Sequence, residues 1–386
     1  NAESVAIIGA SRNETKRGYQ AIRTLLDEKY EGKIYPVNPK EKSILGFKCY
    51  PNVADIAETV DVALVATPAK TLPSVLADCG KKGVKGAVVL AGGFGEIGTD
   101  GRKLEDEMVA AAKKHNIRLV GPNTSGMLNL KDNLNLVGLK DAPRGDIALL
   151  TQSGNMALTL ITEAKIKSRK GFSYYVGVGN EADIKFHEYL EFFRQDPDTR
   201  AILIYVEGMR NGREFLQQAK KTTLEKPIIL LKSGRSVTGK RSAGSHTGAL
   251  AGMSEVAKGA FRGAGIVVIE NSDELFPAAE TLSSLPPIKN NRVAILADGG
   301  GHAADRAGAG DQHVFAQQVE LECGMHRVAV RVEDGGDIKI DTRAVHPDVR
   351  HRQRDILGKR PRPVNPDARG VRTQVAAARH AVAAAA

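Results

Sequence analysis

Short apolar runs alternate with longer amphipathic stretches from Ser4 to about residue 285, and this alternation constrains the fold more than any other feature. The first runs predict strands at Ser4–Ile8, Lys33–Val37, Val62–Ala66, Gly86–Leu90 and Arg118–Val120. The stretches between them have the apolar spacing of helices, at Gly18–Glu28, Leu72–Lys82 and Leu104–His115. Strands that alternate with helices of about a dozen residues form parallel sheets covered on both faces. We therefore predict an α/β fold.

A second series of apolar runs predicts strands at Asp146–Leu150, Ile202–Val206, Ile228–Leu231 and Ile266–Ile269. Pro286-Pro287 interrupts the pattern, and Arg292–Leu296 begins what reads as a third unit. A chain of 386 residues has room for two or three domains. The predicted domains are residues 1–128, 145–285 and 290–386.

The composition changes after His302. Arginine becomes much more frequent than lysine, periodic apolar runs nearly vanish, and basic stretches such as Arg350–Arg354 have little apolar surface to bury. Two explanations stay open: a natural basic tail, or a tail translated out of frame from a GC-rich message.

The remaining composition is that of a soluble protein, with 42% hydrophobic and 26% charged residues. The net charge of +10 raises the question of nucleic acid, but no zinc-finger spacing or RNA-binding aromatic motif accompanies it. Phosphorylated small molecules explain a basic surface equally well. No apolar run is long enough for a membrane span, no secretory signal is recognisable, and the three cysteines lack metal-ligand spacing. We expect a cytoplasmic protein with no metal site, no nucleic-acid partner and no membrane contact.

The first predicted strand ends at Gly9-Ala10-Ser11-Arg12, and a helix follows. A glycine at such a turn lets phosphate groups approach the helix N-terminus, where the helix dipole favours anions. The other glycines of a dinucleotide fingerprint are missing, and Lys40 follows the second strand where that fingerprint has an acidic residue. Because a lysine there attracts a phosphate on a ribose, NADP or coenzyme A is favoured over NAD. An ordinary βα turn with incidental charges is the alternative.

Three further loops follow predicted strands of the first domain. They are Ala66–Lys70, which contains Thr67 and Pro68, the glycine-rich Ala91–Glu96, and Gly121–Gly126, which contains Asn123. Open α/β sheets bind ligands at the carboxyl ends of their strands, so these loops are predicted to surround one crevice with the Gly9 turn.

In the second domain, Ser153-Gly154-Asn155 follows a predicted strand and begins a predicted helix. A hydroxyl, free backbone N–H groups and the positive end of a helix suit a phosphate, although an ordinary N-cap has the same sequence. Glu207 ends another strand, where a carboxylate either holds an imidazole ring or is merely solvated.

His246 lies in the run Gly244–Gly252, directly before Thr247 and Gly248. An imidazole with open space around it is largely unprotonated at neutral pH and can accept and pass on a phosphoryl group. Nearby backbone N–H groups can hold an anion. A glycine-rich loop that happens to contain a histidine is the alternative.

In combination these motifs resemble the α portion of the nucleoside-diphosphate-forming acyl-CoA synthetases, relatives of succinyl-CoA synthetase. The resemblance extends from about Ser4 to His302, and the motifs occur in the same order. They are Gly9-Ala10-Ser11, Gly121-Pro122-Asn123, Gln152-Ser153-Gly154-Asn155, Gly179-Asn180-Glu181-Ala182-Asp183, Glu207-Gly208, Ser245-His246-Thr247-Gly248 and Ala297-Asp298-Gly299-Gly300-Gly301. The resemblance implies a Rossmann-like CoA-binding domain, a flavodoxin-like phosphohistidine domain, and a partial third ligase domain with an aberrant basic tail from about residue 303.

The resemblance also implies roles for individual residues. His246 is expected to be phosphorylated during the reaction, and Glu207 to orient it. Phosphate is expected at Ser153, Gly154, Asn155, Thr247 and Gly248, and coenzyme A at Gly9, Ser11, Arg12, Lys40, Thr67, Pro68 and Asn123.

The implied reaction interconverts acyl-CoA, phosphate and ADP with acid, CoA and ATP through an acyl phosphate, with acetate as the default acid. The sequence contains nothing like the ATP-grasp module that the family uses to bind nucleotide, so this module is either on a separate β subunit or missing. In the first case ADP or ATP and Mg²⁺ are assigned to an ATP-grasp β subunit of a hetero-oligomer.

Two other functions compete with this one. A non-catalytic CoA-binding regulatory module fits the missing ATP-grasp module and the aberrant tail, but His246 argues against it. An NADP-dependent oxidoreductase fits only the first βα turn and leaves both Ser153 and His246 unexplained.

Overall fold

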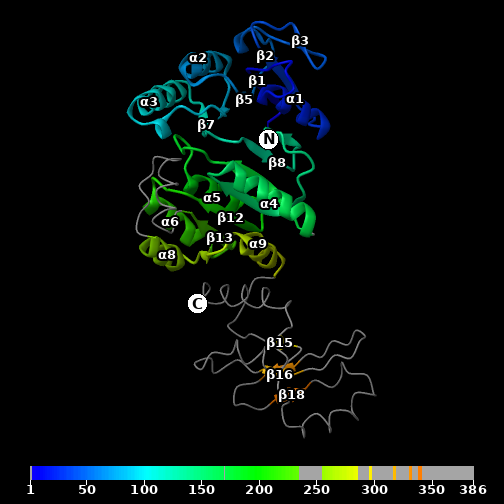
Figure 1. The fold of residues 1–386 in the computed structure, drawn as a ribbon, viewed down its shortest axis with the longest axis vertical. Coiled ribbons are helices and arrows are strands. Elements are labelled where there is room, and N and C mark those ends of the chain that lie inside the picture. The colour runs from blue at the N-terminus through cyan, green and yellow to red at the C-terminus, as the bar shows by residue number, and fades with distance from the viewer. Residues whose placement is uncertain are drawn as a thin grey trace. The chain divides into compact units, whose positions relative to one another are not determined.

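In the computed structural model the two series of apolar runs form two sheets, and helices cover both faces of each (Figure 1). The structure describes residues 2–168, 170–233 and 254–285, with four short strands farther along the chain. The chain divides into two compact units, one reaching Leu285 and the other beginning at Pro286.

The first sheet has the strand order β2-β1-β5-β6-β7, and all neighbouring strands are parallel. Its strands are β1 (Ser4–Ile8), β2 (Lys33–Val37), β5 (Val62–Val65), β6 (Gly86–Val89) and β7 (Arg118–Val120). Its helices are α1 (Arg17–Asp27), α2 (Leu72–Lys82) and α3 (Thr99–Lys114). The hairpin β3 (Ser43–Ile44)–β4 (Phe47–Lys48) and the 3-10 helices η1 (Val53–Asp55), η2 (Ala69–Thr71) and η3 (Gly95–Ile97) lie in the connections.

The second sheet has the order β14-β13-β12-β10-β11-β8-β9. Its parallel strands are β10 (Arg144–Thr151), β11 (Phe172–Gly177), β12 (Ala201–Val206), β13 (Ile228–Lys232) and β14 (Val267–Ile269). The antiparallel pair β8 (Met127–Asn129) and β9 (Leu134–Asn135) extends it beside β11. Its helices are α4 (Gly154–Lys167), α5 (Phe186–Gln195), α6 (Gly212–Thr222), α8 (Ser254–Gly263) and α9 (Leu275–Ser284), with the 3-10 helix η4 (Ser272–Glu274) before α9.

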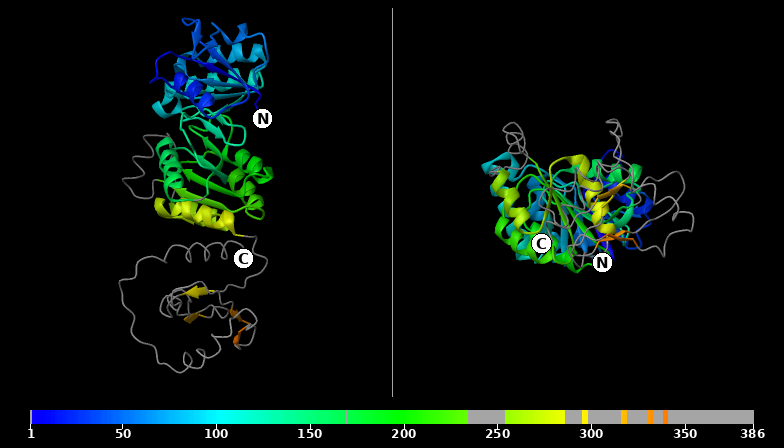
Figure 2. Two further views of the ribbon diagram at one scale, coloured as in Figure 1. Left: turned by 90° about the vertical axis from the view of Figure 1, so that its right-hand side faces the viewer. Right: turned by 90° about the horizontal axis from the view of Figure 1, so that it is seen from below.

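Alternate residues of each strand enter different cores, because successive side chains of a strand point to opposite faces. In β10, Ile147 and Leu149 pack with α4 and α9, whereas Ala148 and Leu150 pack with α5 and α6. Figure 2 shows the yellow α9 on one side of this sheet and green helices on the other. The core that contains Ala148 and Leu150 also contains Val5 and Ile7 of β1, so one apolar cluster joins both sheets.

In the second unit the structure describes only strands. β15 (Ile295–Ala297) pairs in parallel with β16 (Ala316–Gln318), and β17 (Val330–Val332) pairs antiparallel with β18 (Ile338–Ile340). β15 overlaps the strand predicted at Arg292–Leu296. The division into three domains at the predicted boundaries stays a prediction.

The predicted α/β fold is confirmed, although the second sheet is mixed because the unpredicted strands β8 and β9 join it antiparallel. Two further details differ from the prediction. Helix α3 begins at Thr99 rather than Leu104. Its first turn contains Gly101, a poor helix former that is needed there because a Cβ would lie 1.9 Å from the Phe94 carbonyl oxygen. Strand β11 was missed, since Ser173 and the flanking glycines give the run a turn-like composition; the Ser173 hydroxyl is buried against Thr199 Oγ1 at 2.8 Å.

Candidate active site

The turn after β1 lies at the point where the strand order of the first sheet reverses. The chain proceeds from β1 outward to β2 and then back to β5 on the other side of β1, and open α/β sheets bind ligands at such switch points. Gly9 has φ +85°, and a Cβ on it would lie 2.9 Å from the carbonyl oxygen of Ala66. Asn38 Nδ2 donates to the Ala10 carbonyl at 2.7 Å. The loops after β1, β2 and β5 therefore meet, and a glycine is required where they do.

The predicted coenzyme A residues lie on these meeting loops. Arg12 is exposed and pairs with Glu41 at 2.8 Å, while its Nε also donates to the Ser43 carbonyl. Ser11 Oγ accepts from the Asn13 N–H, and Thr67 Oγ1 accepts from Thr71 at 2.9 Å. The remaining predicted members beside Gly9 are Lys40, whose N–H donates to Asn38, and Pro68, which precedes η2. An exposed ion pair such as Arg12–Glu41 contributes little stability, so the arginine can exchange it for a phosphate at small cost.

Asn123, in the loop after β7 of the first sheet, lines a cavity together with residues of the second sheet. This cavity of about 380 Å³ opens at the carboxyl edge of the second sheet, next to the switch point between β10 and β12. Its described lining residues are Asn123, Thr124, Ser125, Gln152, Ser153, Gly154, Asn155, Gly177, Gly179, Asn180 and Glu207. The structure thus brings five predicted site residues from both domains to one cavity: Asn123, Ser153, Gly154, Asn155 and Glu207.

Ser153 is the N-cap of α4. Its Oγ accepts from the Met156 N–H at 3.3 Å, and the helix begins at Gly154, as the sequence predicts. The first N–H groups of a helix have no partner within the helix, and together with the helix dipole they favour an anion. Since Gly154 and Asn155 line the cavity, this helix end is directed at a space where an anion can bind.

Glu207 is held at the cavity by its backbone. Gln152 Oε1 accepts from the N–H groups of Glu207 at 2.7 Å and Gly208 at 3.0 Å, and Gln152 Nε2 donates to the Gly208 carbonyl. On the other side, the buried Lys232 donates through Nζ to the Glu207 carbonyl at 3.0 Å. Gln152 and Lys232 are not among the site residues predicted from the sequence; the position of Gln152 directly before Ser153 is the signal that points to it.

The other predicted catalytic and phosphate residues, His246, Thr247 and Gly248, lie outside the described residues. The last described residue before them, Ser233, donates its N–H to the Val206 carbonyl at 2.9 Å. Because Val206 directly precedes Glu207, this hydrogen bond places the chain end at Ser233 close to Glu207.

The Gly179–Asp183 motif joins the two sheets. The Asn180 N–H donates to the Pro122 carbonyl at 2.9 Å, and the Ala182 N–H donates to the Gly121 carbonyl at 3.1 Å. Asp183 pairs with Arg118 at 3.0 Å. The motif therefore fixes the loop after β7, which carries Asn123, against the second domain.

Glu181, in the middle of this motif, is expected to make stability depend on pH. Its side chain is buried, Oε1 accepts from the Phe186 N–H, and Oε2 has no hydrogen-bond partner within the part of the chain that the structure describes. Burial raises the pKa of this carboxyl, so the folded state holds its proton at a pH where the unfolded chain has lost it. The contribution of Glu181 to stability is therefore greatest below the unfolded pKa of about 4.3 and is lost as pH rises through the folded value.

We expect Glu181→Gln to be more stable than the wild type near pH 8 and to lose this advantage toward pH 4. Urea unfolding at several pH values measures the difference, whose slope is at most about 1.4 kcal/mol per pH unit. Glu58→Gln, at an exposed site, is the control. A constant difference between Glu181→Gln and wild type across this range contradicts the prediction.

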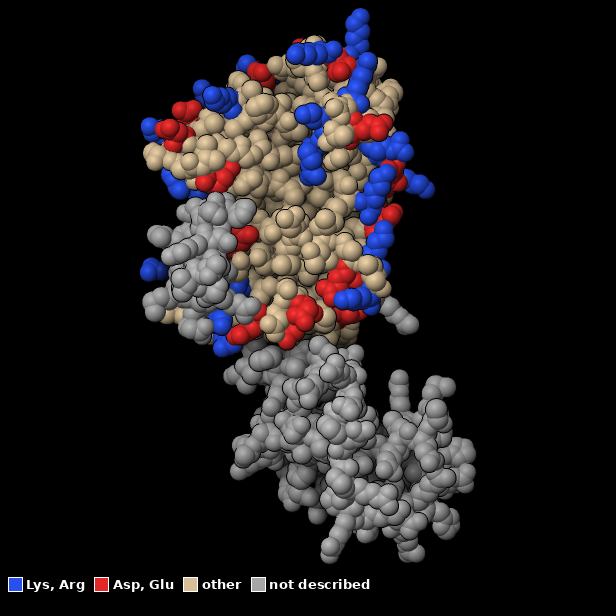
Figure 3. All heavy atoms as spheres, in the orientation of Figure 1, with Lys and Arg blue, Asp and Glu red and all other residues tan. Residues whose placement is uncertain are grey.

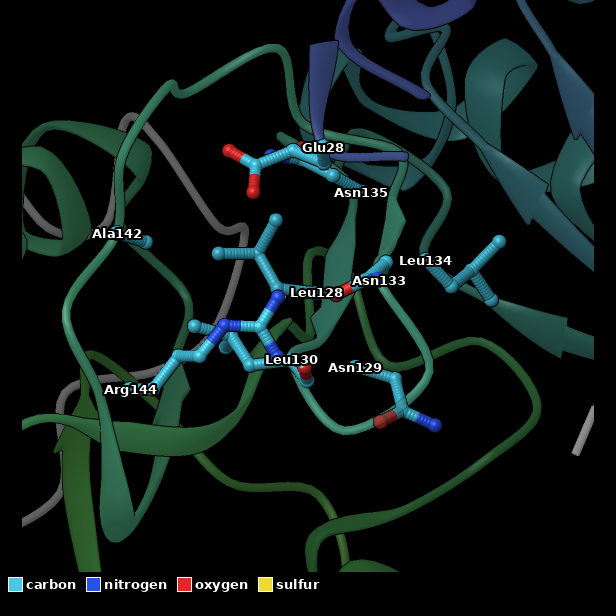
Figure 4. Close-up of a pocket in the computed structure, with 9 residues that line it drawn as sticks. All are labelled: Glu28, Leu128, Asn129, Leu130, Asn133, Leu134, Asn135, Ala142 and Arg144. Atoms are coloured by element: carbon cyan, nitrogen blue, oxygen red, sulfur yellow. Dashed lines mark hydrogen bonds between the residues drawn. The ribbon is translucent and has the colours of Figure 1, made fainter. Parts of the chain in front are cut away.

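A second, much smaller pocket lies between the β8–β9 hairpin and the end of α1. In Figure 4, Glu28 and Arg144 reach toward it from opposite sides with Leu128 between them. Arg144 donates to the Leu130 carbonyl and to Asn133. This pocket has a volume of about 10 Å³, which admits a water molecule but no substrate.

The charged side chains on the face in Figure 3 are mixed in sign. Lys and Arg lie interspersed with Asp and Glu around an uncharged central area. Oppositely charged side chains also form ion pairs at the surface, as Lys131 does with Asp198 and Lys165 with Asp141. Among the described residues no cluster of three or more His, Cys, Asp or Glu could hold a metal ion, and none of the described helices is long and apolar enough to cross a membrane.

Family models match both sheets. A CoA binding domain matches residues 3–129, and a succinyl-CoA ligase like flavodoxin domain matches residues 144–282.

Individual relatives agree with these matches. The α subunit of ADP-forming acetate–CoA ligase I from Pyrococcus furiosus is 42% identical over 330 residues, covering 83% of this chain and 71% of the relative. The ADP-forming acetate–CoA ligase of Methanocaldococcus jannaschii is 43% identical over 300 residues, covering 78% of this chain and 42% of that enzyme.

Among solved structures, the dinucleotide-forming acetyl-coenzyme A synthetase 1 of Ca. Korarchaeum cryptofilum in complex with phosphate and ADP superposes with a TM-score of 0.74 at 38% identity. The match covers 79% of this chain and 66% of that one. This chain thus spans less than half of the M. jannaschii enzyme and about two thirds of the other two proteins. The 42% identity to the P. furiosus α subunit and the matches of both domain models show that the chain belongs to the family of the ADP-forming acetate–CoA ligases.

Proposed function

We propose that this chain is the α subunit of an ADP-forming acyl-CoA synthetase, with acetate as the default acid. One observation carries the proposal: Asn123 of the CoA-binding domain, the N-terminus of α4 and Glu207 line the same cavity. A thioester delivered from the first domain and a phosphate held by the second would meet there.

In the acyl step, coenzyme A lies across Gly9, Ser11, Arg12, Lys40, Thr67 and Pro68, with its thiol end at Asn123. The glycine at position 9 supports this assignment, because a Cβ there would obstruct the turn that the phosphates approach. Phosphate held at Ser153, Gly154 and Asn155 attacks the thioester carbonyl carbon through an oxygen. The carbonyl π pair moves to oxygen and returns as the C–S bond breaks, which yields acyl phosphate and the CoA thiolate.

In the phosphoryl step, an unprotonated nitrogen of His246 attacks the phosphorus of the acyl phosphate. The P–O bond to the acyl group breaks, and the acid leaves as a carboxylate. Glu207 orients the imidazole and stabilises its charged form, while Thr247 and Gly248 bind phosphoryl oxygens. ADP then takes the phosphoryl group from His246 and becomes ATP.

The nucleotide step needs a partner. We assign ADP or ATP and Mg²⁺ to an ATP-grasp β subunit in a hetero-oligomer, which the α-subunit naming of the P. furiosus relative supports. Coenzyme A and ADP are cytoplasmic metabolites, so we place the reaction in the cytoplasm. The domain limits 1–128, 145–285 and 290–386 remain our assignment.

The test is to incubate the chain, alone and with its β subunit, with labelled inorganic phosphate and acetyl-CoA. We expect protein-bound label that is lost in acid and stable in base, as a phosphohistidine is, and none when free CoA replaces acetyl-CoA. Absence of label with the partner and a series of acyl-CoA esters, while CoA still binds, would favour a regulatory CoA-binding module instead.

A further inference from the structure

A hydrogen-bond network centred on the buried side chains of Asn180 and Glu105 connects both domains to the cavity. Asn180 is 7% exposed, and its Nδ2 donates to Glu96 Oε2 at 2.5 Å and to Glu105 Oε2 at 3.1 Å. An amide nitrogen has two N–H groups and an ionised carboxylate only accepts, so these two bonds use both donors of Asn180. Its Oδ1 must then point away from the two carboxylates.

The two carboxylates are themselves fixed. Glu96 Oε1 accepts from the Gly93 N–H at 2.5 Å, and Glu105 Oε2 accepts from the Gly95 N–H at 3.1 Å. Glu105, whose side chain is 3% exposed, also pairs with Arg210 at 3.1 Å. Burial by itself would raise the pKa of Glu96, but the hydrogen bonds from Asn180 and from backbone N–H groups outweigh it and lower this pKa. Glu96 is therefore ionised at neutral pH and acts as an acceptor.

The orientation of Asn180 determines that of Asn123. Asn180 Oδ1 accepts from Asn123 Nδ2 at 3.3 Å, so the amide nitrogen of Asn123 lies on the side of Asn180. The oxygen of the same amide lies against Gly92, where a Cβ would be 3.2 Å from it. Asn123 is exposed and lines the cavity, and the second N–H of its amide has no partner among the described residues.

We infer that Asn123 donates this second N–H to the thioester carbonyl oxygen, and that Glu96, Glu105 and Asn180 are positioning residues that keep the amide in the donating orientation. The inference rests on the proposed function. During phosphate attack the carbonyl oxygen gains negative charge, and a donor already oriented toward it stabilises the transition state more than the bound substrate. An amide in the opposite orientation would present its oxygen and repel that charge.

The acyl step can be measured without His246 or nucleotide. Arsenate in place of phosphate forms an unstable acyl arsenate, so each turnover releases one CoA thiol irreversibly. In the complete complex we expect Asn123→Asp, which removes the donor, and Asn123→Ala, which adds no charge, to lower kcat for thiol release by about 10²–10³-fold with little change in KM for acetyl-CoA. Glu105→Gln should lower it less, because Asn180 keeps one carboxylate. Labelling of His246 from ATP should stay normal in all three.

Asn116→Asp is the matched control, since Asn116 is exposed in the turn before β7, at the opposite edge of the sheet. Unchanged kcat in both Asn123 variants would overturn the inference and leave the proposed function intact. Equal loss of thiol release and ATP labelling would also overturn it, since that indicates a merely structural contact. If the wild type releases no thiol with any acyl-CoA, the proposed function fails.

Discussion

Replacing His246 by asparagine is expected to reduce phosphoenzyme labelling to background and the overall synthesis of ATP by at least about 10⁴-fold. Asparagine keeps the approximate size and polarity of the side chain but has no nucleophilic nitrogen, so no covalent intermediate can form. The measurement is acid-labile label from phosphate and acetyl-CoA, with ATP formation measured in parallel. Thiol release with arsenate should persist, because it precedes the phosphoryl step. His115→Asn, half-buried at the end of α3, is the matched control.

Glu207→Gln should reduce phosphoenzyme labelling less severely than His246→Asn does. A neutral amide can still touch the imidazole but stabilises its charged form poorly, so we expect labelling to slow by about 10²–10⁴-fold while CoA binding is retained. Rapid-quench labelling distinguishes a slowed step from an absent one. Retained ATP synthesis in His246→Asn, or a normal labelling rate in Glu207→Gln, would remove these residues from the proposed roles.

Gly179→Ala is expected to have the largest effect on stability. Gly179 has φ +60°, and a Cβ on it would lie 2.1 Å from the Pro122 carbonyl oxygen and 3.0 Å from that of Asn123. The left-handed backbone and the overpacking together cost about 3 kcal/mol, because the obstructing atoms are backbone and cannot rotate away. Separating them breaks the bond from the Asn180 N–H to Pro122 and pulls the domains apart at the cavity. Thermal unfolding should shift downward by roughly 6–12 °C.

Comparison with Gly83→Ala separates the steric part of this cost from the cost of the left-handed backbone. Gly83 also has a left-handed backbone, with φ +80° at the end of α2, but no described residue other than its chain neighbours lies within 4 Å of its Cβ position. We expect a loss of only about 1 kcal/mol there. Equal losses in the two variants would mean that the contact between Gly179 and Pro122 contributes nothing.

The sequence predicts those parts of the site that lie at strand ends. Gly9, Ser153 and Glu207 each follow a buried apolar run, and parallel strands bring their carboxyl ends to one edge whatever the details of packing. The network around Asn180 could not be predicted, because its partners Glu96 and Glu105 are 84 and 75 positions away. They lie on the 3-10 helix η3, which the sequence does not predict, and on α3, whose predicted start is wrong. Nothing local distinguishes Glu105 from the solvated acids beside it, Asp106 and Glu107.

The Asn123–Asn180 contact has a consequence for how this protein can be recombined with its relatives. The loop after β7, the edge strand of the first sheet, forms one wall of the cavity at the second sheet. A chimera joined near residue 143 therefore takes the two asparagines from different parents, although each parental domain is intact. Such hybrids should fold but have a low kcat unless the Gly179–Asp183 segment is taken from the same parent as the first domain. The segment that must be exchanged as a whole is therefore larger than either sheet.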